Sequence, residues 1–272
     1  MDLEFSENEI QRFSRHILLR EVGGTGQARL KAARVLVVGA GGLGSPLMLY
    51  LAAAGIGTIG VIDDDVVDLS NLQRQVAHTT DRIGMPKVAS ATQAARAINP
   101  DVNVEAHAAR LSADNALDMI GRYDIVCDGT DNFATRFLVA DACVLAKRTL
   151  VSAAVLRFEG QLSVFKPHAG GPCYRCLYAE PPPPGTVPTC SEAGVLGVVT
   201  GVMGTLQATE VLKEILGIGD TLSGRLLVWD ALSAKFRDIK LRPDPSCALC
   251  GPQATIKNLT AHRPPDGSSR AG

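Results

Sequence analysis

The chain has 272 residues, of which 46% are hydrophobic, and its formal net charge at pH 7 is −1. This length predicts one large domain, or one domain with a small appendage, with enough apolar side chains for a sizeable core. Because the charge is balanced, we expect no sequence-independent attraction to nucleic acid or to an anionic membrane. The acidic N-terminus lacks the apolar stretch of a signal peptide, so we expect a cytoplasmic protein.

Residues 1–30 are expected to form an N-terminal helical arm that breaks at residues 22–26. Phe13, Ile17 and Leu18 are spaced so that they form one apolar stripe on a helix. The arm also carries three arginines that point away from this stripe, Arg12, Arg15 and Arg20. On the pattern alone, such arginines belong to a solvated helix face, and nothing distinguishes one from another.

A buried strand at residues 35–38 runs directly into a turn with the pattern GxGxxG. The glycines let the backbone approach a phosphate and aim the N-terminus of the following helix at it. The next strand, residues 58–62, ends at Asp63, about 20 residues further on, where a carboxylate can accept a hydrogen bond from a ribose hydroxyl. The predicted nucleotide site comprises Gly39, Gly41, Gly42, Gly44 and Asp63.

Strands and helices alternate through residues 31–155. We expect strands at residues 35–38, 58–62, 102–106, 124–127 and 149–154, and helices at residues 45–54, 87–98, 112–120 and 134–146. Ser112 is expected to cap the third of these helices. The stretch from 45 to 62 is uncharged, but glycines interrupt it, so it reads as a buried helix and strand rather than a membrane span. The alternation predicts a Rossmann-like, doubly wound, mostly parallel sheet with ligands at the carboxyl ends of its strands.

The pattern changes over residues 156–254. The strands expected here, at residues 160–166, 225–230 and 235–241, alternate more and are not each followed by a helix, which predicts an antiparallel extension of the sheet. A helix is expected at residues 194–216, with Gly197, Gly201 and Gly204 on roughly one face for close packing. Four consecutive prolines within residues 180–188 indicate a loop. The polar tail, residues 255–272, is expected to fray.

A polar run, Ser70–Gln75, lies between two apolar elements. Arg74 and Lys87 both follow carboxyl ends of strands, on the side of the glycine turn. A triphosphate needs several fixed cations and a metal ion around its oxygens. Asp131, after the strand at residues 124–127, is suited to hold Mg²⁺, which prefers oxygen ligands. A dinucleotide site needs no such cluster, and the alternative is that these are ordinary loop charges.

Four of the seven cysteines form two CxxC pairs, Cys173 with Cys176 and Cys247 with Cys250. Four thiolates complete a tetrahedral Zn²⁺ shell with no open position, so the predicted zinc knuckle is structural and ties the end of the chain to the domain. A redox dithiol is the alternative. Cys127 and Cys143 lie on a predicted strand and helix and are expected to be inert packing residues.

In their order along the chain, these motifs resemble the MoeB/ThiF family, the bacterial branch of the ubiquitin-activating enzyme superfamily. The motifs that carry the resemblance are Gly39–Ser45, Asp63, Ser70–Arg74, Pro86–Lys87, Gly129–Asn132 and the two CxxC pairs. The similarity extends from about residue 13 to residue 251, nearly the whole chain.

The resemblance implies an adenylyltransferase whose substrates are ATP and a small ubiquitin-fold sulfur carrier, of the MoaD or ThiS kind, that ends in Gly-Gly. It implies that Arg74 and Lys87 neutralise the triphosphate, that Asp131 positions Mg²⁺ and that Asn71 contacts the phosphates. No general base is required, because the attacking carboxylate is already ionised at neutral pH. Besides the glycines of the turn, the implied ATP-binding residues are Asp63, Ser70, Asn71, Leu72, Gln73, Arg74, Lys87, Asp131 and Asn132.

Two further roles come only from the resemblance. Arg15 matches an arginine that reaches the ATP site of the partner subunit, which implies a functional homodimer. Cys190, after the proline-rich loop, lies where relatives carry a cysteine that accepts the carrier covalently. Members of the MoeB kind dispense with it, and nothing near Cys190 clearly lowers its pKa.

Three functions are weighed: adenylation of a sulfur carrier, an NAD-dependent oxidoreductase, and a non-catalytic scaffold for a ubiquitin-like protein. Arg74, Lys87 and Asp131 argue against the last two. The pathway is left open among molybdopterin, thiamine, cysteine and thiolated tRNA, with a MoeB-like, molybdopterin role favoured by residues 70–74 and 187–194. The chain length leaves no room for a C-terminal rhodanese domain, so the sulfur donor, a cysteine desulfurase or a rhodanese, is expected to be a separate protein.

Overall fold

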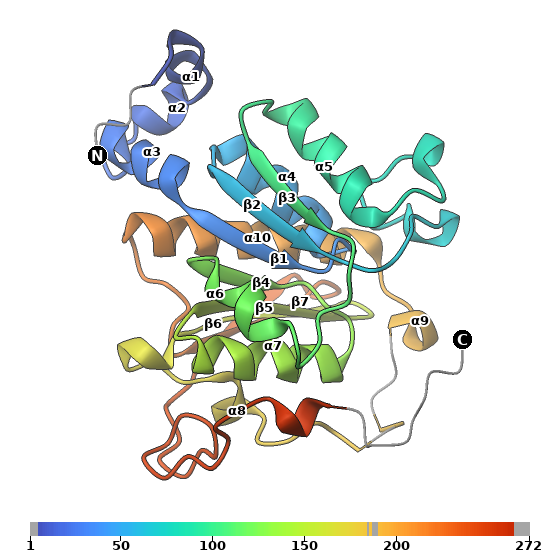
Figure 1. Cartoon of the computed structure of the whole chain (residues 1–272), viewed down its shortest axis with the longest axis vertical. Helices are drawn as coiled ribbons and strands as arrows, with labels where there is room; N and C mark the ends of the chain where they lie inside the picture. Colours follow the sequence, from blue (N-terminus) through green and yellow to red (C-terminus); the bar gives the residue numbers. More distant parts are fainter. Residues whose placement is uncertain (1–4, 184, 187–189, 264–272) are drawn as a thin grey trace.

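The computed structural model describes residues 5–183, 185–186 and 190–263. An eight-stranded sheet, with the strand order β3-β2-β1-β4-β5-β6-β7-β8, forms its centre (Figure 1). The strands are β1 (Arg34–Val38), β2 (Thr58–Ile62), β3 (Asn103–His107), β4 (Ile125–Asp128), β5 (Thr149–Leu156), β6 (Glu159–Phe165), β7 (Arg225–Asp230) and β8 (Lys235–Lys240). Strands β1 to β5 pair in parallel and β6 to β8 antiparallel, which confirms the predicted Rossmann-like sheet and its extension.

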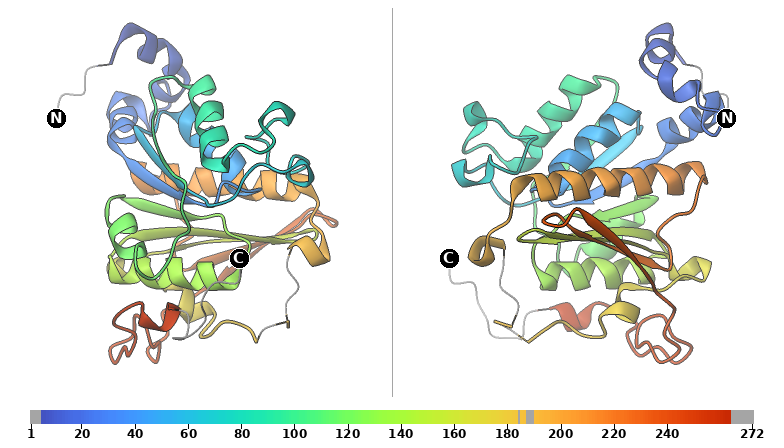
Figure 2. Two further views of the ribbon diagram at one scale, coloured as in Figure 1. Left: turned by 45° about the vertical axis from the view of Figure 1, so that its right-hand side comes forward. Right: turned by 180° about the vertical axis from the view of Figure 1, so that it is seen from behind.

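Helices cover both faces of the sheet. The helices are α1 (Glu7–Arg12), α2 (Ser14–Ile17), α3 (Gly23–Ala32), α4 (Gly44–Ala54), α5 (Lys87–Ile98), α6 (Ala116–Gly121), α7 (Phe133–Leu145), α8 (Tyr174–Leu177), α9 (Cys190–Ala193) and α10 (Gly197–Leu216). Figure 2 shows α10 along one face of the sheet and α7 on the other. Among the described residues, no helix has the length and apolar character needed to cross a membrane.

Alternate residues of β1 supply two separate cores. Val35 and Val37 pack with side chains of α4, α5 and α10, whereas Leu36 and Val38 pack with side chains of α6 and α7. Both faces are therefore buried, which explains why β1 reads as a continuous apolar run rather than an alternating one. The two layers leave the carboxyl ends of β1, β2 and β4 at one edge, where the glycine turn begins.

Helix α10 confirms the close packing expected of its glycines, with one exception. A Cβ atom at Gly204 would lie 2.5 Å from the carbonyl oxygen of Leu43, and one at Gly197 would lie 2.2 Å from that of Gln73. A Cβ atom at Gly201 would meet nothing within 4 Å. The prediction for Gly201 is therefore wrong, because this residue faces away from the backbone that the other two approach.

Two predicted helical segments are corrected. The arm consists of α1, α2 and α3 rather than one helix broken at residues 22–26, since α3 begins at Gly23. Phe13 is buried, but Leu18 is 73% exposed, because α2 ends at Ile17 and the helical spacing does not continue. Helix α6 begins only at Ala116, because the backbone N–H of Ser112 is bound by the side chain of Asn115 in a turn.

The polar end of the chain packs on the domain as far as it is described. Leu259 is buried against the second core, and Nε2 of His262 lies 2.7 Å from Oδ2 of Asp141 on α7. The expectation that the chain frays from residue 255 is therefore wrong for residues 255–263. Residues 264–272, and residues 184 and 187–189 of the proline-rich loop, lie outside the described part of the chain.

Candidate active site and metal centre

A cavity of about 360 Å³ opens at the carboxyl ends of β1, β2 and β4. Its wall combines the glycine turn, the carboxylates after β2, the segment after β4 and the first residue of α5. It brings together most of the predicted nucleotide-binding residues: Gly39, Gly41, Gly42, Asp63, Arg74, Lys87, Asp131 and Asn132. Ser70, Asn71, Leu72 and Gln73 are not among the residues that line it, and neither is Gly44.

The peptide unit of Ala40 in the glycine turn is held from both sides. Its N–H donates to Oδ2 of Asp63 at 2.7 Å, and its carbonyl lies 2.9 Å from Nε2 of His78. Because a carbonyl can only accept, Nε2 carries the proton, and Nδ1 faces the hydroxyl of Ser90 at 2.9 Å. Burial lowers the pKa of His78 and raises that of Asp63. The turn is thus held by a neutral imidazole and a carboxylate.

Gly44 shapes the turn without lining the cavity. A Cβ atom there would lie 1.9 Å from the carbonyl oxygen of Gly39, whose φ of +92° is itself in the region that favours glycine. The predicted role of the glycines in a close turn is therefore supported by geometry. Any side chain at Gly44 would push the start of α4 away from β1.

Arg110 and the two predicted cations line the cavity, and each of the predicted two is held by a neighbouring group. Lys87 is 6% exposed, and its Nζ lies 2.8 Å from Oδ2 of the exposed Asp65. Nη1 of Arg74 donates to the carbonyl oxygen of Ser70 at 3.1 Å. The run that carries Ser70 therefore supports Arg74 through its backbone, while its own side chains lie outside the cavity wall. A polyphosphate entering here would meet both cations.

Carboxylates stand beside these cations. One carboxylate oxygen from each of Asp63, Asp64 and Asp65 lies within 4.8 Å of the others, and Asp131 is exposed on the same cavity. Oδ1 of Asn132 accepts from the N–H of Thr135 at 2.9 Å and so caps α7. Oxygen ligands of this kind suit Mg²⁺, whereas the cap role occupies one face of Asn132.

The residues that line the cavity without having been predicted as site residues include Gln75, Asp65 and Thr200. Gln75 is 4% exposed, and its Oε1 has no hydrogen-bond partner among the described residues. Its place at the end of the polar run was a usable signal. Asp65 could have been found as the partner of Lys87 only from the fold. Thr200 comes from α10, and its hydroxyl donates to the carbonyl oxygen of Arg74 at 3.4 Å. No local sequence pattern predicts this contact.

Asp128 and Arg136 form a buried ion pair next to the cavity. Nε of Arg136 lies 3.3 Å from Oδ2 of Asp128, and Nη2 donates to the carbonyl of Thr130 at 2.6 Å. Oδ2 of Asp128 also accepts from the hydroxyl of Ser152 at 2.9 Å. This salt bridge, together with the hydrogen bond to Thr130, holds the segment after β4 in place.

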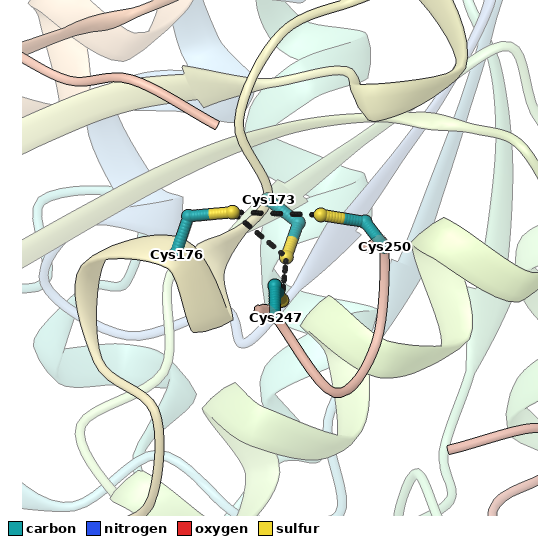
Figure 3. A group of neighbouring side chains, drawn as sticks. All are labelled: Cys173, Cys176, Cys247 and Cys250. Atoms are coloured by element: carbon teal, nitrogen blue, oxygen red, sulfur yellow. Dashed lines mark hydrogen bonds between the residues drawn. The ribbon is translucent and has the colours of Figure 1, made fainter. Parts of the chain in front are cut away.

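The two CxxC pairs meet in one cluster (Figure 3), against which Val144 of α7 packs. The sulfur–sulfur distances are 3.5 Å between Cys173 and Cys247, 3.4 Å between Cys176 and Cys250 and 3.8 Å between Cys173 and Cys176. Four sulfurs each about 2.3 Å from Zn²⁺ in a tetrahedron would be about 3.8 Å apart. The donor set and its size therefore fit a zinc ion, as predicted. Cys127 and Cys143 are buried, and burial raises the pKa of both thiols, as expected for packing residues.

The remaining two predicted residues are not in this cavity. Arg15 lies on α2, is exposed and does not line it. Cys190 begins α9, but its side chain lies outside the described part of the structure. The roles assigned to both by resemblance remain predictions.

Comparison with known proteins gives a family match and named relatives. Residues 13–249 match the ThiF family. A Bos taurus protein named adenylyltransferase and sulfurtransferase MOCS3 is 54% identical over 265 residues, which are 97% of this chain and 58% of that protein. A Thermus thermophilus protein named sulfur carrier protein adenylyltransferase is 49% identical over 261 residues, which are 94% of this chain and 96% of that protein.

Solved structures show the same fold at lower identity. The crystal structure of E. coli MccB with AMPCPP and MccA has a TM-score of 0.79 to this chain at 24% sequence identity. The superposition covers 91% of this chain and 75% of that one.

Proposed function

Because this chain belongs to the ThiF family, we propose that it is an adenylyltransferase that transfers AMP from ATP to the C-terminal carboxylate of a small ubiquitin-fold sulfur carrier ending in Gly-Gly. The observation that carries this proposal is the single cavity in which the glycine turn, Arg74 and Lys87 meet the carboxylates after β2 and β4. A site for a dinucleotide needs no such pair of cations, so the residues of this cavity argue against the oxidoreductase alternative.

In this reaction an oxygen of the carrier carboxylate forms a bond to the α-phosphorus of ATP. The bond between the α-phosphorus and the bridging oxygen breaks, and pyrophosphate leaves with the electron pair. The product is a carrier–AMP mixed anhydride. Lys87 and Arg74 stabilise negative charge on the triphosphate and on the leaving group, so catalysis rests on positioning and electrostatics.

The nucleotide and metal assignments follow from the chemistry of the lining groups. The carboxylate of Asp63 would accept a hydrogen bond from a ribose hydroxyl. It already holds the glycine turn by accepting from the N–H of Ala40. Asp131, with Asp64 and Asp65 nearby, offers the oxygen ligands that Mg²⁺ prefers, and the ion would supply positive charge to the phosphates. The four cysteines would hold a structural Zn²⁺.

The assembly we propose is a homodimer in which Arg15 reaches the ATP site of the partner subunit. The exposure of Arg15 away from its own cavity supports this arrangement. A covalent role for Cys190 is a separate proposal that adenylation does not require.

The biological setting we propose is cytoplasmic, with a MoaD-like carrier of molybdopterin synthesis as the favoured substrate and a ThiS-like carrier as the alternative. We propose that the sulfur comes from a separate protein, a cysteine desulfurase or a rhodanese.

The experiment that tests this function is ATP–pyrophosphate exchange with the purified protein and a panel of MoaD-like and ThiS-like carriers. Exchange that requires one carrier with an intact Gly-Gly end would support adenylation and identify the pathway. ATP binding with no exchange for any carrier would favour the non-catalytic scaffold for a ubiquitin-like protein. Absence of ATP binding would favour the NAD-dependent oxidoreductase.

A further inference from the structure

One end of the nucleotide cavity is formed by the segment that follows β3, residues Ala109–Leu111. In the sheet, β3 is the neighbour of β2 on the side away from β1. The glycine turn follows β1, Asp63 follows β2 and this segment follows β3, so the three groups succeed one another along the edge of the sheet. Because adjacent strands are about 4.8 Å apart, the segment lies one strand beyond Asp63 as seen from the turn.

Backbone and side-chain hydrogen bonds hold this segment beside Asp63. The carbonyl oxygen of His107 accepts from the backbone N–H of Asp63 at 3.2 Å and from that of Ala109 at 2.9 Å, so the chain turns directly next to Asp63. From the other side, Nδ2 of Asn115 donates to the carbonyl oxygen of Arg110 at 3.0 Å. The place at which the side chain of Arg110 leaves the backbone is therefore set by the fold.

The side chains at this end of the cavity differ in character. Leu111 is 5% exposed and packs in the second core together with Ile62, and both line the cavity. Arg110 is exposed, and its guanidinium takes part in no hydrogen bond or ion pair with any other described residue. This end of the cavity thus combines an apolar floor with a planar cation that has no partner within the described chain.

The covalent order of a nucleotide fixes the direction in which it would lie here. The glycine turn and the start of α4 suit the phosphates, and Asp63 suits the ribose. The ribose lies between the phosphates and the base, so a base that continues past Asp63 reaches Ala109–Leu111. A purine offers two flat aromatic faces, of which one can rest on the apolar floor and the other can stack on a guanidinium.

We infer that Arg110 is a nucleotide-binding residue whose guanidinium stacks on the base of ATP, above the floor made by Leu111 and Ile62. The inference rests on the proposed function, because it requires ATP in this cavity with its ribose at Asp63. Arg110 then contributes affinity for the base, whereas the charge that the triphosphate meets comes from Arg74 and Lys87.

The test divides ATP into its two parts. The affinities of the purified protein for ATP, adenosine and inorganic tripolyphosphate are measured with Mg²⁺ present, those of the two fragments by displacement of radiolabelled ATP. Arg110→Ala should weaken the binding of ATP and of adenosine about tenfold and change the binding of tripolyphosphate less than about twofold. Arg110→Lys, which retains the charge but loses the planar group, should lose most of the adenosine affinity as well.

Pyrophosphate exchange gives a second measurement on Arg110→Ala. The KM for ATP should rise about tenfold, while the rate at saturating ATP should stay unchanged, because the base is not part of the chemical step. A fall in that rate with an unchanged KM would contradict a contact with the base.

The matched control is Arg96→Ala, an exposed arginine of α5 that does not line the nucleotide cavity. This variant should leave all three affinities unchanged. Equal losses of ATP and tripolyphosphate affinity in Arg110→Ala would assign Arg110 to the phosphates, and an unchanged adenosine affinity would exclude the contact with the base; either result overturns the inference. Failure of the proposed function would appear separately in the wild-type protein, as absence of ATP binding or of exchange with every carrier.

Discussion

Lys87 is deeply buried, and among the described residues its ion-pair partner is Asp65. Its partner Asp65 is largely exposed, so a phosphate can replace or join that carboxylate without leaving an uncompensated charge. Lys87→Met keeps the volume of the side chain but removes its charge. We expect pyrophosphate exchange to fall by about 10²- to 10³-fold, as for loss of one preorganised electrostatic contact.

The control for this variant is Lys166→Met, because Lys166 also pairs with one carboxylate, that of Glu214, but lies outside the nucleotide cavity. Exchange by this variant should match that of the wild type. A Lys87→Met protein that retains folding and full exchange would contradict the role assigned to Lys87.

His78 makes a prediction about pH. Burial, followed by the proximity of Lys87, holds its pKa below the usual value, although the carbonyl of Ala40 opposes the shift. The unfolded chain therefore binds a proton more readily than the folded one below about pH 6.5, so the free energy of unfolding falls as the pH is lowered through that range. The contribution of one such group is at most about 1.4 kcal/mol per pH unit.

Chemical denaturation of the wild type and of His78→Gln between pH 8 and pH 5 measures this effect. The glutamine variant should be less stable at pH 8, where it loses the clamp on the glycine turn, and should show a shallower decline toward pH 5. Parallel curves for the two proteins would show that His78 does not titrate as described.

At the scale of elements, α10 offers a pair of glycines in different surroundings. Gly204→Ala would place a Cβ atom 2.5 Å from the carbonyl of Leu43 and force α10 away from α4. We expect a loss of roughly 1–3 kcal/mol in the free energy of unfolding. Gly201→Ala, one turn earlier in the same helix, meets nothing within 4 Å and should be neutral or stabilising by up to about 1 kcal/mol.

Thermal and urea unfolding of the two variants under identical conditions gives the comparison. Since helix propensity changes equally at both positions, the difference between them isolates the packing of α10 on α4. Equal effects of the two substitutions would contradict the close approach seen at Gly204.

At the scale of the whole molecule, the proposed homodimer predicts complementation between two inactive proteins. Arg15→Ala lacks the residue donated to the partner, and Arg74→Ala lacks a residue of the receiving cavity. A mixed dimer has one site with Arg74 intact and Arg15 supplied by the other subunit. Equal mixing after subunit exchange should restore about a quarter of wild-type exchange, because half of the dimers are mixed and each has one working site.

Pyrophosphate exchange of the mixture, with each variant alone as the control, measures this. No recovery, although mass spectrometry detects mixed dimers, would show that Arg15 does not act across the interface. Activity of Arg15→Ala alone at the wild-type level would lead to the same conclusion.

Local patterns in the sequence were sufficient for much of this molecule. The strands fall within two residues of their predicted ends, because apolar or alternating runs and their flanking turns are local signals. The errors lie where a side chain competes with helix geometry, as at Ser112, or where helices restart within a short arm, as at Leu18. These outcomes depend on partners that no periodicity reveals.

The sequence by itself determined the mostly parallel pairing of the first five strands, the glycine turn, Arg74 and Lys87 as cations, and the two CxxC pairs, because each depends on residue types at short spacings along the chain. Only the tertiary structure decided that Gln75 and Thr200 join the cavity and that Ser70–Gln73 stay outside its wall. It also decided that α8, which contains Cys176, lines a second, largely apolar cavity next to the nucleotide cavity. The physical reason is that such contacts join residues far apart in the chain, and sheet order and layer packing, rather than neighbouring residues, bring them together.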